Sequence, residues 1–113
     1  MTFAEVQRLA LALPEATEEL TWGTDTTWRV RGKIFAIGGA ESPGVTLKAS
    51  ISDQAALVAG RPDTFAIAPY VGRYGWVNAT LSTVDVSELG ELLVEAWRRT
   101  APKKLVREYD ARA

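Results

Sequence analysis

The chain has 113 residues, of which 47% are hydrophobic and 24% are charged, as expected for one globular domain. It contains no cysteine and no histidine, which excludes thiolate and imidazole catalysis and the usual zinc sites. No apolar run approaches the about 20 residues of a transmembrane helix, and the N-terminus does not have the pattern of a signal peptide. We therefore expect one non-catalytic, cytoplasmic domain over residues 1–113, monomeric and without cofactor or metal.

Charge is distributed unevenly along this chain. The net charge of −1 counts against indiscriminate DNA binding, which usually needs a strongly basic surface. The first 25 residues contain five acids and a single base, Arg8, whereas residues 98–112 contain six bases and two acids. Local patches can therefore matter more than the total charge.

The first half of the chain predicts a helix followed by strands. A helix over Thr2–Leu13 begins with a capping box of Thr2 and Glu5, and Pro14 ends it. The hydrophobic period then changes to alternation, which is typical of strands. The expected strands span Thr17–Trp22, Thr26–Val30, Lys33–Gly38 and Val45–Ser50.

The second half predicts helices around one or two further strands. Ser52 should cap a short helix that ends at Ala59, and Asp85, with Glu88 in a capping box, should cap the longest helix. The other expected elements are an extended segment at Thr64–Ala68, a loop at Pro69–Gly75, a strand at Trp76–Leu81, and a last helix from Pro102 to about Asp110.

This order of elements predicts an α+β fold. Strands joined by short turns should pair antiparallel. We expect a two-layer domain in which a sheet of five to six strands is covered on one face by the N- and C-terminal helices.

The first candidate site is a basic cluster on the expected sheet. Arg29, Arg31 and Lys48 occupy outward positions of strands that we expect to be neighbours, and Lys33 lies at the intervening turn. Such a cluster attracts phosphate groups. The alternative is a solvated sheet face with acids nearby.

The second candidate site is the loop before the last expected strand. Arg73, Tyr74 and Trp76 place a cation and two aromatic rings together, and such rings can stack on bases or sugars. The alternative is that the tryptophan is buried, as tryptophan usually is.

Several segments together resemble the MmcQ/YjbR family. They are TWGTDTTWRVRGKIFAIGG, VTLKAS, PYVGRYGWVNATL and ELLVEAWRRTAPKKLV, in that order, and they extend over most of the chain. The resemblance implies a fold similar to type III secretion chaperones and to CyaY, and a "double wing" mode of DNA binding in which two hairpins flank a helix. The wings would be the Arg29–Lys33 hairpin and the loop through Arg73 and Trp76.

The chain departs from the family pattern in the second wing. Many relatives have N-K-x-H-W before the last strand, whereas residues 70–76 here contain no histidine. Arg73 can replace the lysine as a phosphate contact, but a metal or pH-sensitive role for the histidines is lost.

These observations lead to three hypotheses. The first is a domain that binds nucleic acid, in particular double-stranded DNA, with phosphate contacts and a stacking tryptophan supplied by Arg29, Arg31, Lys33, Lys48, Arg73 and Trp76. The second is a protein-interaction module that uses a sheet edge or an apolar groove. The third is a small-ligand pocket near Trp22, Trp28 and Trp76.

Overall fold

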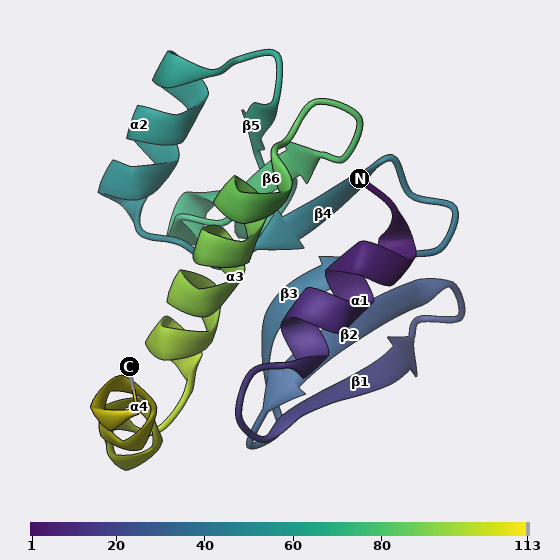
Figure 1. The fold of residues 1–113 in the computed structure, drawn as a ribbon. Coiled ribbons are helices and arrows are strands. Elements are labelled where there is room, and N and C mark those ends of the chain that lie inside the picture. Colours follow the sequence, from purple (N-terminus) through teal and green to yellow (C-terminus); the bar gives the residue numbers. More distant parts are fainter. Residues whose placement is uncertain (113) are drawn as a thin grey trace.

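The structure, a computed structural model, describes residues 1–112 (Figure 1). The helices are α1 (Phe3–Leu11), α2 (Ile51–Gly60), α3 (Val86–Thr100) and α4 (Lys103–Ala111), with a single 3₁₀ turn, η1 (Val71–Tyr74). The strands are β1 (Ala16–Thr21), β2 (Asp25–Val30), β3 (Lys33–Gly38), β4 (Gly44–Leu47), β5 (Phe65–Ile67) and β6 (Val77–Thr80). Within the described residues, no helix has both the length and the apolar character to cross a membrane.

The strands form one antiparallel, six-stranded sheet in the order β1-β2-β3-β4-β6-β5. Helices α1 and α3 cross the same side of this sheet (Figure 1), which confirms the predicted two-layer α+β architecture. The prediction that the strands of Arg29 and Lys48 are neighbours is wrong. Strand β3 returns between β2 and β4 and pairs with both.

The helix caps follow the predicted chemistry with two changes. The capping box of α1 is present. Helix α2 is capped by Ser50, whose Oγ accepts from the Asp53 amide, and not by the predicted Ser52. Asp85 caps α3 by accepting from the amides of its first turn. The side chain of Glu88 does not complete a capping box, because it pairs with Arg61.

The core lies between the sheet and its helices. The largest fully buried side chains include Trp28, Phe35, Leu89 and Trp97. A β-bulge interrupts the pairing of β2 with β3, so that Trp28 faces Ala36 and the next pair skips Phe35. Both Phe35 and Ala36 are consequently buried, where strict alternation predicts one of them outside.

The strand registers define the two ends of the sheet. Strand β4 runs antiparallel to β3, and β6 begins at Val77, opposite Leu47 at the end of β4. The turn between β2 and β3, the end of β4 and the connection from β5 to β6 therefore lie at one end. The connections from β1 to β2, from β3 to β4 and from α2 to β5 lie at the opposite end.

Candidate functional site

Arg29 lies on the sheet face away from α1 and α3, and its guanidinium is engaged by neighbours. Its Nε lies 3.0 Å from Oε2 of Glu19 on β1 and 3.2 Å from the Thr27 hydroxyl. Its Nη1 donates to the Gly32 carbonyl at 3.3 Å. Only 22% of the Arg29 side chain is exposed, and its guanidinium already has these partners. Arg29 is therefore poorly placed to bind a phosphate group.

Arg31 lies in the tight turn between β2 and β3, where it adopts a left-handed backbone with φ 52°. Its guanidinium binds the Glu15 carboxylate through two nitrogens, and the Nη2–Oε2 distance is 3.0 Å. These hydrogen bonds lower the pKa of Glu15 and raise the pKa of Arg31. Arg31 is exposed but shares its charge with Glu15.

The other four predicted site residues lie near strand ends. Lys33 is exposed at the start of β3, and Lys48 is half-buried just after β4. Arg73 is exposed in η1, with its guanidinium carbon 4.8 Å from the centre of the Tyr74 ring, while Trp76 is half-buried before β6. Within residues 1–112, no carboxylate lies within ion-pair distance of Lys33, Lys48 or Arg73.

A buried amide fixes the loop that carries Arg73. Nε2 of Gln54 on α2 donates to the carbonyl oxygens of Gly72 at 2.8 Å and Trp76 at 2.7 Å. Gln54 is 6% exposed, so these two bonds hold η1 against α2. The position of Arg73 is therefore set by a packed helix and not by a free loop.

The end of the sheet with the β2–β3 turn gathers most of these cations, and we call it the basic end. Four of the six predicted residues belong to it, namely Arg31, Lys33, Lys48 and Arg73. Arg29 is not counted in the basic end, because its guanidinium is engaged by Glu19, Thr27 and Gly32.

Helix α4 brings further bases to the basic end. Nε1 of Trp97 donates to the Pro14 carbonyl just before β1 at 3.0 Å, which anchors the last turns of α3 there. Lys104 on α4 and Arg31 line the same shallow pocket. Sequence reasoning did not assign this contribution to the site, although the Lys103-Lys104 pair and the basic C-terminal segment were visible signals. The helix contains the bases Lys103, Lys104 and Arg107 and the acids Glu108 and Asp110, and Glu108 lines the same pocket as Lys104.

The opposite end of the sheet is rich in carboxylates, and we call it the acidic end. Asp25 begins β2 at this end, and Glu41, Asp63 and Asp85 lie in connections there. The ends of the sheet therefore differ in charge although the chain as a whole has a net charge of only −1.

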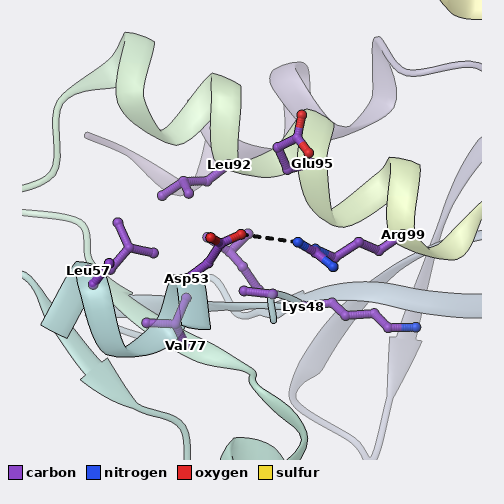
Figure 2. Close-up of a pocket in the computed structure, with 10 residues that line it drawn as sticks. Lys48, Asp53, Leu57, Val77, Leu92, Glu95 and Arg99 are labelled. Atoms are coloured by element: carbon purple, nitrogen blue, oxygen red, sulfur yellow. Dashed lines mark hydrogen bonds and ion pairs between the residues drawn. The ribbon is translucent and has the colours of Figure 1, made fainter. Parts of the chain in front are cut away.

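A cleft of about 260 Å³ opens beside the basic end, between α2, α3 and the strands β4 and β6. Figure 2 shows Leu57, Val77 and Leu92 around its interior. Nη2 of Arg99 on α3 lies 3.0 Å from Oδ2 of Asp53 on α2, so that an ion pair bridges the two helices.

The three tryptophans of the predicted ligand pocket do not line a common pocket. Trp28 is fully buried, and its indole Nε1 donates to Glu18 at 2.8 Å. Trp22 is 69% exposed and borders a shallow hollow of about 370 Å³ on the uncovered sheet face. Trp76 does not line that hollow.

Comparisons with known proteins agree with this architecture. Uncharacterized proteins of Mycobacterium bovis (Mb2600) and Mycobacterium tuberculosis (Rv2570) are each 29% identical over 96% of this chain and 95% of the relative. The crystal structure of Deinococcus radiodurans protein DR2400, with a DUF419 domain, matches with a TM-score of 0.77 at 20% identity, over 85% of this chain and 75% of that chain. The YjbR family model matches residues 11–99, and the chain therefore belongs to the YjbR family.

Proposed function

We propose that this chain is a non-catalytic nucleic-acid-binding domain that contacts phosphate groups through the basic end of its sheet. The observation that carries the proposal is that the β2–β3 turn, the η1 loop and α4 all lie at that end of the sheet. In this proposal the β2–β3 turn and the η1 loop serve as the two wings, and α4 adds positive charge beside the first of them.

The structure changes the roles of the residues in this proposal. Lys33, Arg73 and Lys104 are exposed, and they supply the phosphate contacts. Arg31 contributes less because Glu15 neutralises it. The stacking role moves from the half-buried Trp76 to Tyr74, which is 62% exposed beside Arg73.

The separation of charge also favours one orientation on a polyanion. A duplex carries a dense row of phosphates, so the basic end is drawn toward it while the acidic end is repelled. Contacts of this kind position a protein without reading base sequence. We therefore propose binding that depends strongly on salt and weakly on sequence.

The test is fluorescence anisotropy with a labelled duplex at about 50 mM and about 200 mM salt. The double variant Lys33→Gln with Lys104→Gln removes two positive charges from the basic end. Each lost phosphate contact should reduce the slope of log affinity against log salt by about one.

A matched control adds two negative charges at the acidic end. Ser82→Glu with Ala40→Glu changes the net charge by the same amount at exposed positions. The control should retain binding. No binding by the wild-type protein at about 50 mM salt, or equal losses in both double variants, would overturn the proposal.

A protein-interaction role is the second candidate, and the edge strand β1 favours it. Leu20 on β1 is 73% exposed, and Trp22 directly follows the strand. An exposed edge can pair with a strand of another chain, although charged residues such as Glu19 oppose this. A partner that survives nuclease treatment and is lost in Leu20→Glu would support this role, and a partner retained by Leu20→Glu would count against it.

A further inference from the structure

The cleft between α2 and α3 has the composition of a small binding site. Leu47 and Val77 form a buried floor, while Leu57 on α2 and Leu92 on α3 remain only half-buried. A dry cavity of about 150 Å³ can hold benzene, so the 260 Å³ of this cleft has room for a larger apolar group. These apolar walls offer water few hydrogen-bond partners. An apolar ligand that covers them removes apolar surface from water, which is favourable.

The charges around the cleft leave one cation without a partner. Asp53 is paired with Arg99 at 3.0 Å, and Glu95 with Arg98 at 3.7 Å. Lys48 lies at the rim, and Figure 2 shows its ammonium group directed away from the ion pair of Asp53 and Arg99. The charged residues that line the cleft are Lys48, Asp53, Glu95 and Arg99. Within the described residues, Lys48 is the one of these four that has no ion-pair partner.

We propose that this cleft binds a small organic monocarboxylate with an apolar chain or ring of about eight carbon atoms. The apolar part lies against Leu57 and Leu92. The carboxylate binds the Lys48 ammonium at the rim, since Arg99 is already paired with Asp53. Lys48, predicted from the sequence as a phosphate contact, thereby receives a carboxylate partner.

This inference does not rest on the proposed nucleic-acid binding. The two sites are tested with different ligands and different variants. Loss of duplex binding on removing Lys33 and Lys104 leaves the cleft intact, and a failure of carboxylate binding leaves the phosphate contacts untouched.

The experiment is a ¹⁵N–¹H NMR titration of the full chain with octanoate, and in parallel with 1-octanol. Octanoate should shift the amides that line the cleft, including Leu57 and Leu92, with a Kd of about 1 mM, as expected for a ligand of this size. It should bind at least about threefold more tightly than octanol because only the acid carries the charge. Absence of saturable shifts in the cleft up to about ten times that Kd, or equal affinity for the alcohol, would overturn the proposal.

Two variants separate the charged rim from the apolar interior. Lys48→Gln should lower octanoate affinity to that of octanol and leave octanol binding unchanged, while Arg8→Gln, an exposed cation outside the cleft, should change neither. Ala56→Leu fills the cleft from an exposed helical position and should abolish both. Ala56→Met serves the same purpose if the leucine variant does not fold, and octanoate binding that survives a folded filled variant would also overturn the proposal.

Discussion

The indole Nε1 of Trp28 donates a hydrogen bond of 2.8 Å to Oε1 of Glu18. Trp28 is fully buried in β2, whereas Glu18 belongs to the edge strand β1 and is exposed. Nε2 of Gln7 on α1 donates to the same carboxylate at 3.0 and 3.1 Å. Glu18 therefore joins the edge of the sheet, the first helix and one of the two fully buried tryptophans of the core.

Replacing Glu18 should lower the free energy of unfolding more than replacing an ordinary exposed glutamate does. Glu18→Ala leaves the buried indole N–H without its acceptor, which costs about 1–3 kcal/mol. Glu18→Gln keeps an acceptor oxygen and should cost less. The measurement is the free energy of unfolding in urea, with Glu91→Ala on the exposed face of α3 as the control. Equal losses in Glu18→Ala and Glu91→Ala would contradict the role of this hydrogen bond.

Removing the side-chain amide of Gln54 should release the η1 loop. Gln54→Leu removes the side-chain donor that the carbonyl oxygens of Gly72 and Trp76 share. Each oxygen keeps one backbone donor, from Gly75 and Ala68 respectively, so the cost should be about 1 kcal/mol or more. Hydrogen exchange should accelerate in residues 71–76 more than in the rest of the domain. Ala55→Leu, at an exposed position of the same helix, should alter neither quantity.

Most of the fold follows from local signals in the sequence. Strand β3 is predicted with its observed bounds, Lys33–Gly38, because a segment rich in β-formers lies between the turn at Gly32 and a glycine-rich loop. The start of α2 was placed too late because Ser50 and Ser52 are equally good caps by type, and only the three-dimensional path selects Ser50. The bulge at Phe35 also has no local signal, since it depends on the pairing of β3 with β2.

The site was less predictable than the fold. Whether a cation is free to bind a ligand depends on ion-pair partners that belong to other elements of the chain. The pairs of Arg29 with Glu19 and Arg31 with Glu15 form only after β1 is placed beside β2, and residue types alone do not fix that register. The contribution of Lys104 requires the packing of α4, where the Tyr109 ring lies 5.1 Å from that of Trp97.

The Glu15–Arg31 ion pair should be visible in acid titration. The pKa of Glu15 is lowered because Arg31 donates hydrogen bonds to its charged form. A carboxylate with a depressed folded-state pKa contributes stability above its unfolded pKa, and this contribution is lost as the pH falls through the folded pKa. Arg31→Gln should therefore raise the pKa of Glu15 toward its usual value, as measured by NMR titration of the side-chain carboxyl.

Glu5 provides an internal control for that titration. Its pKa is lowered chiefly by the Thr2 amide, with a further contribution from the Thr2 hydroxyl. Arg31→Gln should leave the Glu5 titration unchanged. Because Glu15 and Arg31 are exposed, high salt should weaken the shift at Glu15. A Glu15 titration that does not respond to Arg31→Gln would show that the pair is not formed in solution.

Two glycines should respond in opposite ways to the same substitution. Gly75 has φ +102°, and a Cβ there would lie 2.6 Å from the Ala49 carbonyl oxygen and 2.7 Å from the Ser50 carbonyl carbon. These are backbone atoms at the start of α2 that cannot rotate away, so Gly75→Ala should cost about 2 kcal/mol or more. Nothing lies within 4 Å of a Cβ at Gly60, in the last turn of α2, and Gly60→Ala should stabilise by up to about 1 kcal/mol.

The comparison of these two variants also tests whether the η1 loop is packed against α2. Gly75→Ala should disturb the same segment as Gln54→Leu, because both changes act where residues 71–76 meet α2. Urea denaturation gives the stabilities, and amide shifts of Gly72 and Arg73 report the position of the loop. Equal and small effects of Gly75→Ala and Gly60→Ala would mean that the loop is not packed against α2 as described. Arg73 would then lack the fixed position that phosphate binding at the basic end requires.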